Sequence, residues 1–264
     1  MSQIRTRRTL LTVAAAVVAL STSTYTGIAG ANTQPAGETL APKLVWTPDP
    51  ARDGLNAFEG VEDRNSADPG TKHIAVRDGA WRFDMHRRDR DGSDRQRQEV
   101  KGMRQAGQML EMKNGSTWRI TYDMFIPTTL HGTSKFSHIF QLKMPGTGTG
   151  PLVTMSLRRS GGEEQIALRA FESGGDIGSA ALAPLRNKWI SIDMTFRIGN
   201  SGSGRFIVRD GDQVVVDKSR SGIDIWLGDR IRPKWGIYRS IGSASTDIID
   251  TYLLIRNMRA YEGA

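Results

Sequence analysis

The segment Lys188-Trp-Ile-Ser-Ile-Asp-Met-Thr-Phe-Arg-Ile198 indicates the fold class. Apolar side chains occupy every second position from Ile190 to Ile198, and polar side chains stand between most of them. Because side chains alternate between the two faces of a β-strand, this pattern predicts a strand with one buried face and one wet face. Thr117–Ile126 repeats the pattern, with its apolar face running from Trp118 to Ile126.

Further strand-like runs are separated by Gly, Asn, Asp and Pro. They cover Ala80–Met85, Arg95–Lys101, Ser134–Lys143, Leu152–Arg158, Gln165–Phe171, Arg205–Arg209, Gln213–Asp217, Ile231–Arg239 and Ile248–Tyr261. Asp210-Gly211 predicts a hairpin turn between two of them. The only helical structure that we expect is a short turn at Asp224–Gly228. Many short strands predict an all-β protein, a jelly-roll sandwich of two antiparallel, concanavalin-like sheets.

The first 31 residues have the pattern of an export signal. Paired Arg7 and Arg8 precede a short apolar run, and small residues before Asn32 offer a cleavage site. The run is too short to span a bilayer, and the paired arginines favour a twin-arginine signal over an ordinary secretory signal. We therefore expect a signal peptide at 1–31, a flexible lead-in at 32–42, one catalytic domain at 43–264, and a secreted protein without membrane attachment after cleavage.

The composition of the chain excludes several kinds of chemistry. The chain has no cysteine, which excludes disulfides, thiolate nucleophiles and cysteine-bound metals. Of the formal charge of +8, three units come from arginines in the first 31 residues, which hold no acid, so the remainder carries +5. This excess favours an acidic partner. Because basic residues interleave with acids and the protein is exported, we expect an acidic polysaccharide rather than nucleic acid. A monomer is the expected state, although the sequence does not determine it.

The segment Arg232-Pro-Lys-Trp-Gly-Ile-Tyr-Arg239 carries the strongest functional signal. As a strand it places Arg232, Lys234, Gly236 and Tyr238 on one face, a row of two cations and a phenol that suits a polyanion. Gly236 would leave a gap for a close ligand. Positive charge from Lys234, and from Arg232 or Arg239, would help Tyr238 to give up its proton. The structural alternative is a half-buried strand with a basic exposed face.

Arg95-Gln-Arg-Gln-Glu-Val-Lys101 is the second such segment. Alternation places Arg95, Arg97 and Glu99 on one face, and Gln98 on the other. Arg97 can form a fork-like pair with a sugar carboxylate while Glu99 holds it in place. The alternative is a charged edge strand that resists aggregation.

A third segment, Lys135–Lys143, contains the best acid–base candidate among the four histidines, His138. Alternation would place His138, Phe140 and Leu142 on one face and Gln141 on the other. A hydrogen-bonded structural histidine is the alternative.

One loop has the composition of a cation site. Asp89, Asp91 and Asp94 resemble a short calcium loop without the ligand spacing of an EF-hand. A polar turn is the favoured interpretation, so we expect no required cofactor and hold a structural Ca²⁺ as the weaker option.

Taken together, these segments resemble polysaccharide lyases of the β-jelly-roll type, above all glucuronan lyases and the related heparin lyase I and alginate lyase groups. The match covers most of residues 43–261 and rests on Arg95–Glu99, Ser134–Lys143, Pro151–Leu157 and Arg232–Ser240. Lys234, Gly236 and Tyr238 match the Lys-x-Gly-x-Tyr element with the catalytic tyrosine. Arg97 and Glu99 match the Arg-x-Glu element that handles the uronate carboxylate.

One departure concerns the central strand. Alginate lyases carry Gln-x-His where this chain has His138-Ile-Phe140. The group that neutralises the carboxylate therefore stays open among His138, Gln98 and Gln141.

The resemblance implies a concave groove and cleavage of a 4-linked uronate polysaccharide by β-elimination. It implies the catalytic residues Tyr238, His138 and Arg97, and the substrate-binding residues Lys234, Glu99, Arg232, Arg239, Gln141, Gln98 and Arg95. A single tyrosine suits sugars whose C5 proton and O4 lie on the same side of the ring, so we expect a glucuronan-like substrate. The alternative function is a non-catalytic, lectin-like module that binds acidic polysaccharide.

Overall fold

The computed structural model describes residues 41–64, 66–146, 148–171 and 173–263. They belong to one compact unit. The expected signal peptide at 1–31 and nearly all of the lead-in at 32–42 lie outside the described residues. Within the described part of the chain, no helix is long and apolar enough to cross a membrane.

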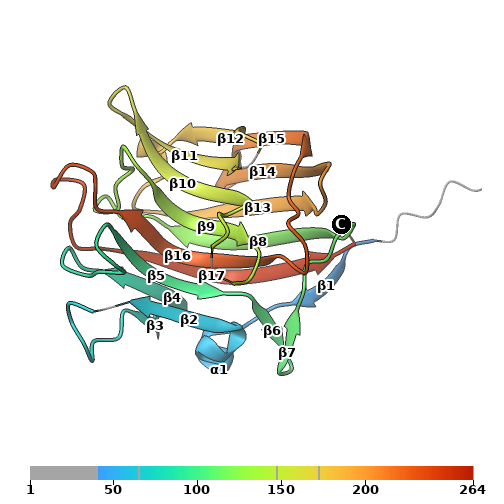
Figure 1. Ribbon diagram of the computed structural model, residues 1–264, viewed down its shortest axis with the longest axis horizontal. Helices are drawn as coiled ribbons and strands as arrows, with labels where there is room; N and C mark the ends of the chain where they lie inside the picture. Colours follow the sequence, from blue (N-terminus) through green and yellow to red (C-terminus); the bar gives the residue numbers. More distant parts are fainter. Residues whose placement is uncertain (1–40, 65, 147, 172, 264) are drawn as a thin grey trace, which may run out of the picture. The chain divides into compact units, whose positions relative to one another are not determined.

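Two large antiparallel sheets lie in stacked layers (Figure 1). One has the strand order β15-β14-β13-β8-β17-β4-β3, and β1 pairs with β17 beside it. Its strands are β1 (Lys43–Trp46), β3 (Ile74–Arg77), β4 (Ala80–Met85), β8 (Thr117–Phe125), β13 (Trp189–Arg197), β14 (Gly202–Asp210), β15 (Gln213–Ile223) and β17 (Thr251–Glu262).

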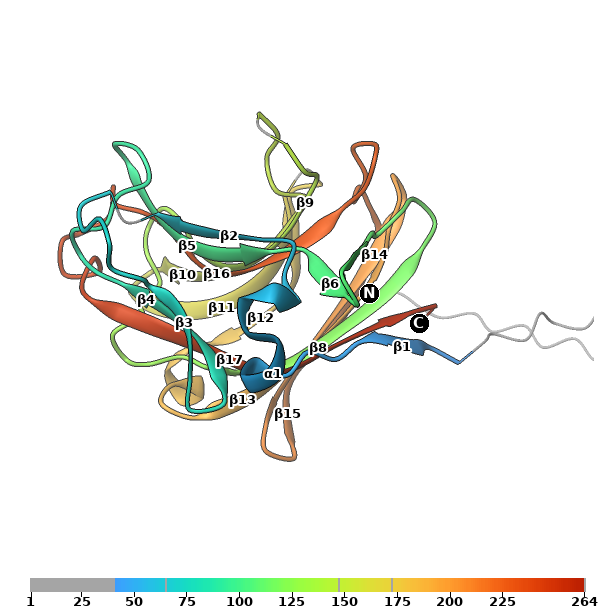
Figure 2. The same cartoon turned by 90° about the horizontal axis from the view of Figure 1, so that it is seen from below.

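The other sheet has the order β12-β11-β10-β9-β16-β5-β2. Its strands are β2 (Gly60–Arg64), β5 (Arg95–Lys101), β9 (Ser137–Lys143), β10 (Val153–Ser160), β11 (Glu163–Ala170), β12 (Gly175–Ala181) and β16 (Arg232–Ser240). Figure 2 shows β2 and β5 of this sheet above β3, β4 and β17 of the first. The expected jelly-roll sandwich of two antiparallel sheets is confirmed.

The remaining elements are short. They are a two-stranded ribbon of β6 (Met103–Gln105) and β7 (Gln108–Leu110), the helix α1 (Pro50–Asp53), and the 3₁₀ turns η1 (Gly54–Ala57) and η2 (Ala183–Leu185). Asp49 caps α1, because its side chain accepts a hydrogen bond from the amide of Arg52.

The core lies between the sheets and follows the predicted alternation. Every second residue of β13 is buried from Ile190 to Phe196, and β8 repeats this from Trp118 to Met124. Phe140 of β9 stacks on Phe196, with ring centroids 6.3 Å apart, so the inner faces of the two sheets meet there. Complete burial of such side chains contributes roughly 1.5–3 kcal/mol each.

Two expectations about secondary structure need correction. Asp224–Gly228 contains no helical turn, because Ile225 is fully buried and its amide donates to the carbonyl of Gly199, which holds this stretch extended. Short strands at sheet margins, including β2 and β12, escaped sequence analysis. Their exposed and buried residues do not alternate cleanly.

Candidate active site

Three neighbouring strands bring the predicted catalytic residues together. β16 lies between β5 and β9 in its sheet. Its register pairs Tyr238 with Arg97 of β5 on one side and with His138 of β9 on the other. The three residues therefore form one row across the sheet, although Arg97 and Tyr238 are more than a hundred positions apart in the chain.

A β-bulge at Ile139 changes the alternation expected for β9. Consecutive residues Met155 and Ser156 of β10 pair with Phe140 and His138, so Ile139 is an extra residue. Ile139 and Phe140 both belong to the buried core. The prediction that His138 and Phe140 share a face is therefore wrong, and His138 and Gln141 both reach the outer face of the sheet.

Gly236 is required by the neighbouring strand and does not open space for a ligand. Its φ angle is +132°, and a Cβ atom there would lie 2.1 Å from the carbonyl oxygen of Gln98 and 2.9 Å from Phe83. The expectation of a gap facing the ligand is therefore wrong. The missing side chain instead lets β16 lie tightly against β5.

Two arginines surround the phenol of Tyr238. The guanidinium carbon of Arg97 lies 3.7 Å from the centroid of the tyrosine ring, and Nη1 of Arg95 donates to the hydroxyl oxygen at 3.1 Å. The rings of His138 and Phe136 lie 5.9 Å and 5.0 Å from it, between centroids. Two guanidinium groups therefore contact the phenol, one at its hydroxyl oxygen and one at its ring.

Glu99 organises the cations beside this row. It is almost fully buried, and it accepts hydrogen bonds from Arg97 at 2.8 Å, from Lys234 at 2.6 Å, and from Gln141. Lys234 also donates to Glu62 at 2.7 Å. Lys234 thus bonds to carboxylates and not to the hydroxyl of Tyr238, so the cations expected beside the phenol are replaced by Arg95 and Arg97.

Glu62, on the edge strand β2, completes this network. Burial acts to raise its pKa, but the charge and hydrogen bond of Lys234, together with Arg97 and Lys101, lower the pKa of Glu62 to about 2. The carboxylate is therefore ionised at neutral pH and balances part of the local positive charge.

His138 is a neutral imidazole at neutral pH. Burial, with help from the charges of Arg97 and Lys234, lowers its pKa from 6.5 to about 4. Its Nδ1 shares a hydrogen bond of 2.7 Å with the hydroxyl of Ser156, which fixes the ring. The side chain is 9% exposed, so only an edge of the ring reaches the surface.

Two hollows on this face adjoin at Tyr238, which lines both together with Pro151. One, of about 550 Å³, is lined by charged and polar groups that include Glu62, Arg95, Arg97, Gln141 and Lys234. The other, of about 460 Å³, includes Phe136, His138, Ser156, Arg158 and Phe171. A larger hollow of about 700 Å³ lies near α1 and β6, and no histidine or aromatic ring lines it. Because Tyr238 and His138 line the first two hollows, we take these two as the candidate site.

Three predicted substrate-binding residues do not line these hollows. One is Glu99, which is buried and holds Arg97 and Lys234 instead. The other two are Gln98 and Arg239. Gln98 is fully buried, and its side chain exchanges two hydrogen bonds with the backbone of Arg64. Arg239 is also fully buried and donates to Gln96 and to the carbonyl of Ile249. The predictions for Gln98 and Arg239 are wrong, because alternation turns these side chains away from Tyr238. Gln98 is therefore excluded as the group that neutralises the substrate carboxylate.

Arg232 lines the first hollow, and its Nη1 pairs with the carboxylate of Glu59. The three aspartates of the possible calcium loop have separate partners. Asp91 binds Nε of Arg97 at 2.7 Å and Asp94 binds Nε of Arg95 at 2.7 Å, whereas Asp89 is buried among histidines. Among the described residues these three carboxylates do not form a metal-binding group.

Sequence analysis missed several groups around the site. Phe136 stacks on the ring of His138 at 4.9 Å, Ser156 binds its Nδ1, and Asp91 and Glu62 hold Arg97. Phe136 and Ser156 lie inside segments that carry the family resemblance, which was an available signal. Glu62 lies on a strand that no periodicity marks, so only tertiary structure reveals it.

No protein-family model and no curated protein sequence matches this chain. Among solved structures the chain is similar to alginate lyase A1-II′, a member of polysaccharide lyase family 7. The TM-score is 0.58 at 11% sequence identity, over 81% of this chain and 99% of that chain. A His→Asn, Tyr→Phe double variant of that enzyme in complex with substrate (GGMG) gives a TM-score of 0.57 at 12% identity, over 82% and 97% of the two chains. A Tyr→Phe variant in complex with product (GGG) gives 0.54 at 10% identity, over 83% and 100%. At these identities the comparisons establish a shared fold.

Proposed function

We propose that this protein is a secreted polysaccharide lyase that cleaves a 4-linked uronate polysaccharide by β-elimination. The observation that carries the proposal is the position of Tyr238, whose hydroxyl accepts a hydrogen bond from Arg95 and whose ring lies against Arg97 where two hollows adjoin. The fold shared with alginate lyases supports it, and so does a surface of cationic and polar groups suited to an acidic polysaccharide.

In the proposed reaction Tyr238 acts first as a base. The phenolate takes the proton from C5 of the uronate, and the electron pair that is left is delocalised into the carboxylate as an enolate. The C4–O4 bond then breaks, a double bond forms between C4 and C5, and the proton passes from Tyr238 to O4. No water is added, so one chain becomes a saturated fragment and an unsaturated fragment.

We assign Arg97 the role of binding and neutralising the substrate carboxylate. Asp91 and Glu99 fix its Nε and Nη1, and no described residue accepts a hydrogen bond from its Nη2, which is left for a ligand. A fixed cation at the developing enolate stabilises the transition state without reorganisation. His138, as a neutral imidazole, can add a hydrogen bond but not a charge. Gln141 is held by Glu99.

We further propose glucuronan-like chains as substrate. In glucuronate and mannuronate units the C5 proton and O4 lie on the same side of the ring, so one tyrosine can serve as base and then as acid. In guluronate units they lie on opposite sides and a second residue is needed. Most of the His138 ring is buried, which makes it a poor second base and favours the same-side substrates.

The deciding experiment follows the ultraviolet absorbance of the unsaturated product on glucuronan, polymannuronate and polyguluronate. We expect turnover on the first two, and Tyr238→Phe should reduce it by roughly 10²–10⁴-fold while substrate binding is kept. The variant removes one hydrogen bond worth about 1 kcal/mol, so it should stay folded.

If the protein is instead a lectin-like module, wild type and Tyr238→Phe should both bind the polysaccharide, and neither should form the unsaturated product. Turnover that persists in Tyr238→Phe would contradict the assigned base, and preferred cleavage of polyguluronate would contradict the substrate class.

A further inference from the structure

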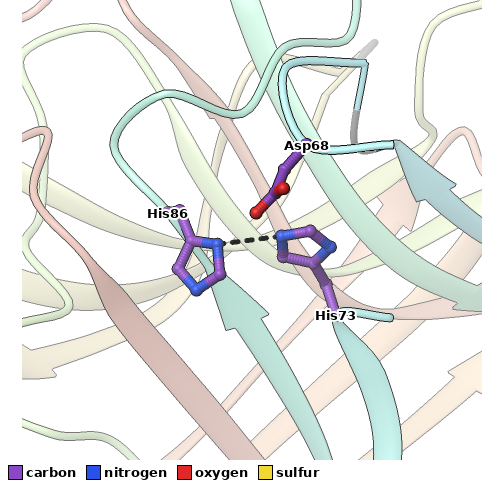
Figure 3. A group of neighbouring side chains, drawn as sticks. All are labelled: Asp68, His73 and His86. Carbon is purple, nitrogen blue, oxygen red and sulfur yellow. Dashed lines mark hydrogen bonds between the residues drawn. The ribbon is translucent and has the colours of Figure 1, made fainter. Parts of the chain in front are cut away.

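A second cluster of polar side chains lies where β3 begins and β4 ends. His73 directly precedes β3, His86 directly follows β4, and Asp68 comes from the loop after β2. Figure 3 shows the carboxylate of Asp68 above the two imidazoles, which face one another. One ligand atom from each residue lies within 4.8 Å of the others. None of the three lines the two hollows at Tyr238.

The tautomer of His73 can be assigned from its partners. Its Nδ1 lies 3.1 Å from the carbonyl oxygen of Thr71, and a carbonyl can only accept, so Nδ1 carries a hydrogen. In the neutral ring Nε2 then presents a lone pair. A backbone carbonyl that binds one ring nitrogen and orients the other is typical of metal-binding histidines.

That lone pair faces Nδ1 of His86, which can donate to it in one tautomer, and the carboxylate of Asp89, which can only accept. Nε2 of His73 lies 3.0 Å from Nδ1 of His86 and 3.2 Å from Oδ2 of Asp89. Oδ2 of Asp89 already accepts the backbone amide of His86 at 2.7 Å. A lone pair and a carboxylate at this distance repel each other unless a positive group lies between or beside them.

Asp89 gives an independent sign of a missing partner. Its side chain is fully buried, and Oδ1 has no hydrogen-bond partner. Arg239, a buried cation whose charge interacts with that of Asp89, donates to Gln96 and to the carbonyl of Ile249, and its Nη1 has no partner either. A buried carboxylate oxygen without a partner is costly, so it marks the place of an unseen cation.

We propose that His73 Nε2, His86 Nδ1 and a carboxylate oxygen of Asp68 bind a divalent first-row transition metal ion of the zinc class, with Asp89 as fourth ligand or as its charge partner. Two imidazoles with carboxylates are the ligand set of such ions, whereas Ca²⁺ and Mg²⁺ prefer oxygen alone. Two nitrogens bound to a tetrahedral ion lie about 3.3 Å apart, close to the separation of His73 and His86.

The ion can reach this cluster from the surface through His86. The His86 side chain is 34% exposed and lines a hollow of about 450 Å³. Asp68 accepts a hydrogen bond from Arg88 through Oδ2 at 2.8 Å and also hydrogen-bonds to the side chain of Thr71, so it would bind the ion in addition to these partners.

Metal at this position would hold the loop that leads to the proposed catalytic strand. Nε2 of Gln96, on β5, donates to the carbonyls of His86, Arg87 and Asp89, each at 2.9 Å. The same loop carries Asp91, which binds Arg97. The metal site is therefore structural and can be tested apart from any lyase activity.

The test uses the full chain after dialysis against a chelator. Added Co²⁺ should give the visible d–d absorption of a tetrahedral site at one equivalent. Zn²⁺ at a hundredfold excess over its dissociation constant should displace the Co²⁺ and raise Tm by about 5–10 °C. Ca²⁺ should do neither.

The variants are His86→Gln and Asp68→Asn, both at partly exposed positions, and His131→Gln is the matched control at another partly exposed histidine paired with an acid. Both site variants should lose the Co²⁺ band and the Zn²⁺-dependent Tm shift, and the control should keep both. Wild-type protein without either signal would mean that no such ion binds beside His73 and Asp89. That result, or signals that survive in His86→Gln, would overturn the proposal.

Discussion

The charges differ among the three residues of the row, Tyr238, Arg97 and His138. Arg97 is a permanent cation held by acids, and His138 is kept neutral by burial and by that neighbouring charge. Because His138 is neutral, Arg97 supplies the fixed positive charge of the row, on the other side of Tyr238.

The stability of the folded protein should report the protonation of His138. The unfolded imidazole binds a proton below pH 6.5, whereas the folded one does so only near pH 4, so the free energy of unfolding falls as pH falls through this window. The loss is roughly 3 kcal/mol at full effect. His138→Gln has no such group, so its stability relative to wild type should rise by that amount between pH 6.5 and pH 4.

Urea unfolding at several pH values measures this difference, and His131→Gln serves as control because its side chain is partly exposed. If the difference between wild type and His138→Gln does not change with pH, the imidazole is not held neutral by the fold.

At the scale of strands, the site depends on how closely β16 lies against β5. Gly236 combines a positive φ angle with a Cβ position inside the van der Waals shell of Gln98 and Phe83. Any side chain would push the strands apart beside Tyr238, so a backbone feature controls the geometry of the row.

Gly236→Ala should therefore destabilise the protein by roughly 2–4 kcal/mol, through backbone strain and overpacking. Gly228→Ala is the matched control. Gly228 also has a positive φ angle, +111°, but a Cβ there would meet nothing within 4 Å, so its variant reports strain alone. Urea midpoints compare the two, and equal losses would show that the contact with β5 is unimportant.

Much of the strand pattern could be predicted because alternation is a local property. The limits predicted for β4 and β5 match those observed, and β8 and β13 bury the faces expected. In β9 the predicted alternation of faces is wrong because of one residue. The bulge at Ile139 arises from pairing with β10, which no local pattern in β9 reveals.

At the scale of the whole molecule, the hollow at Tyr238 combines several cations with the carboxylates of Glu62 and Asp91. The hollow at Tyr238 gathers Lys143, Arg95, Arg97 and Lys234 within a chain that is basic overall. Burial, and then the charges of Lys234, Arg232 and Arg97, lower the pKa of Lys143, which is the direction expected where cations crowd together.

If the substrate is a polyanion, its binding should weaken with salt. Between about 0.05 M and 0.5 M NaCl we expect KM to rise at least about threefold while kcat stays nearly constant, because screening acts on association and not on the desolvated row at Tyr238. Lys143→Gln should raise KM at low salt and reduce this dependence. Lys188→Gln, directly before β13 of the other sheet and paired with Asp210, should leave both unchanged. A kcat that falls with salt, or equal effects of both variants, would contradict this account.

By itself, the sequence determined that the protein is an all-β sandwich and that Arg97, His138 and Tyr238 lie on strands with basic neighbours, because alternation and charge are written along each segment. Only the tertiary structure decided that β16 separates β5 from β9, that Gln98 and Arg239 point away from the hollows, and that Asp91 and Glu62 hold Arg97. Strand order and register arise from hydrogen bonds between distant segments. A one-residue change in pairing reverses the face of every side chain beyond it, so no single segment contains that information.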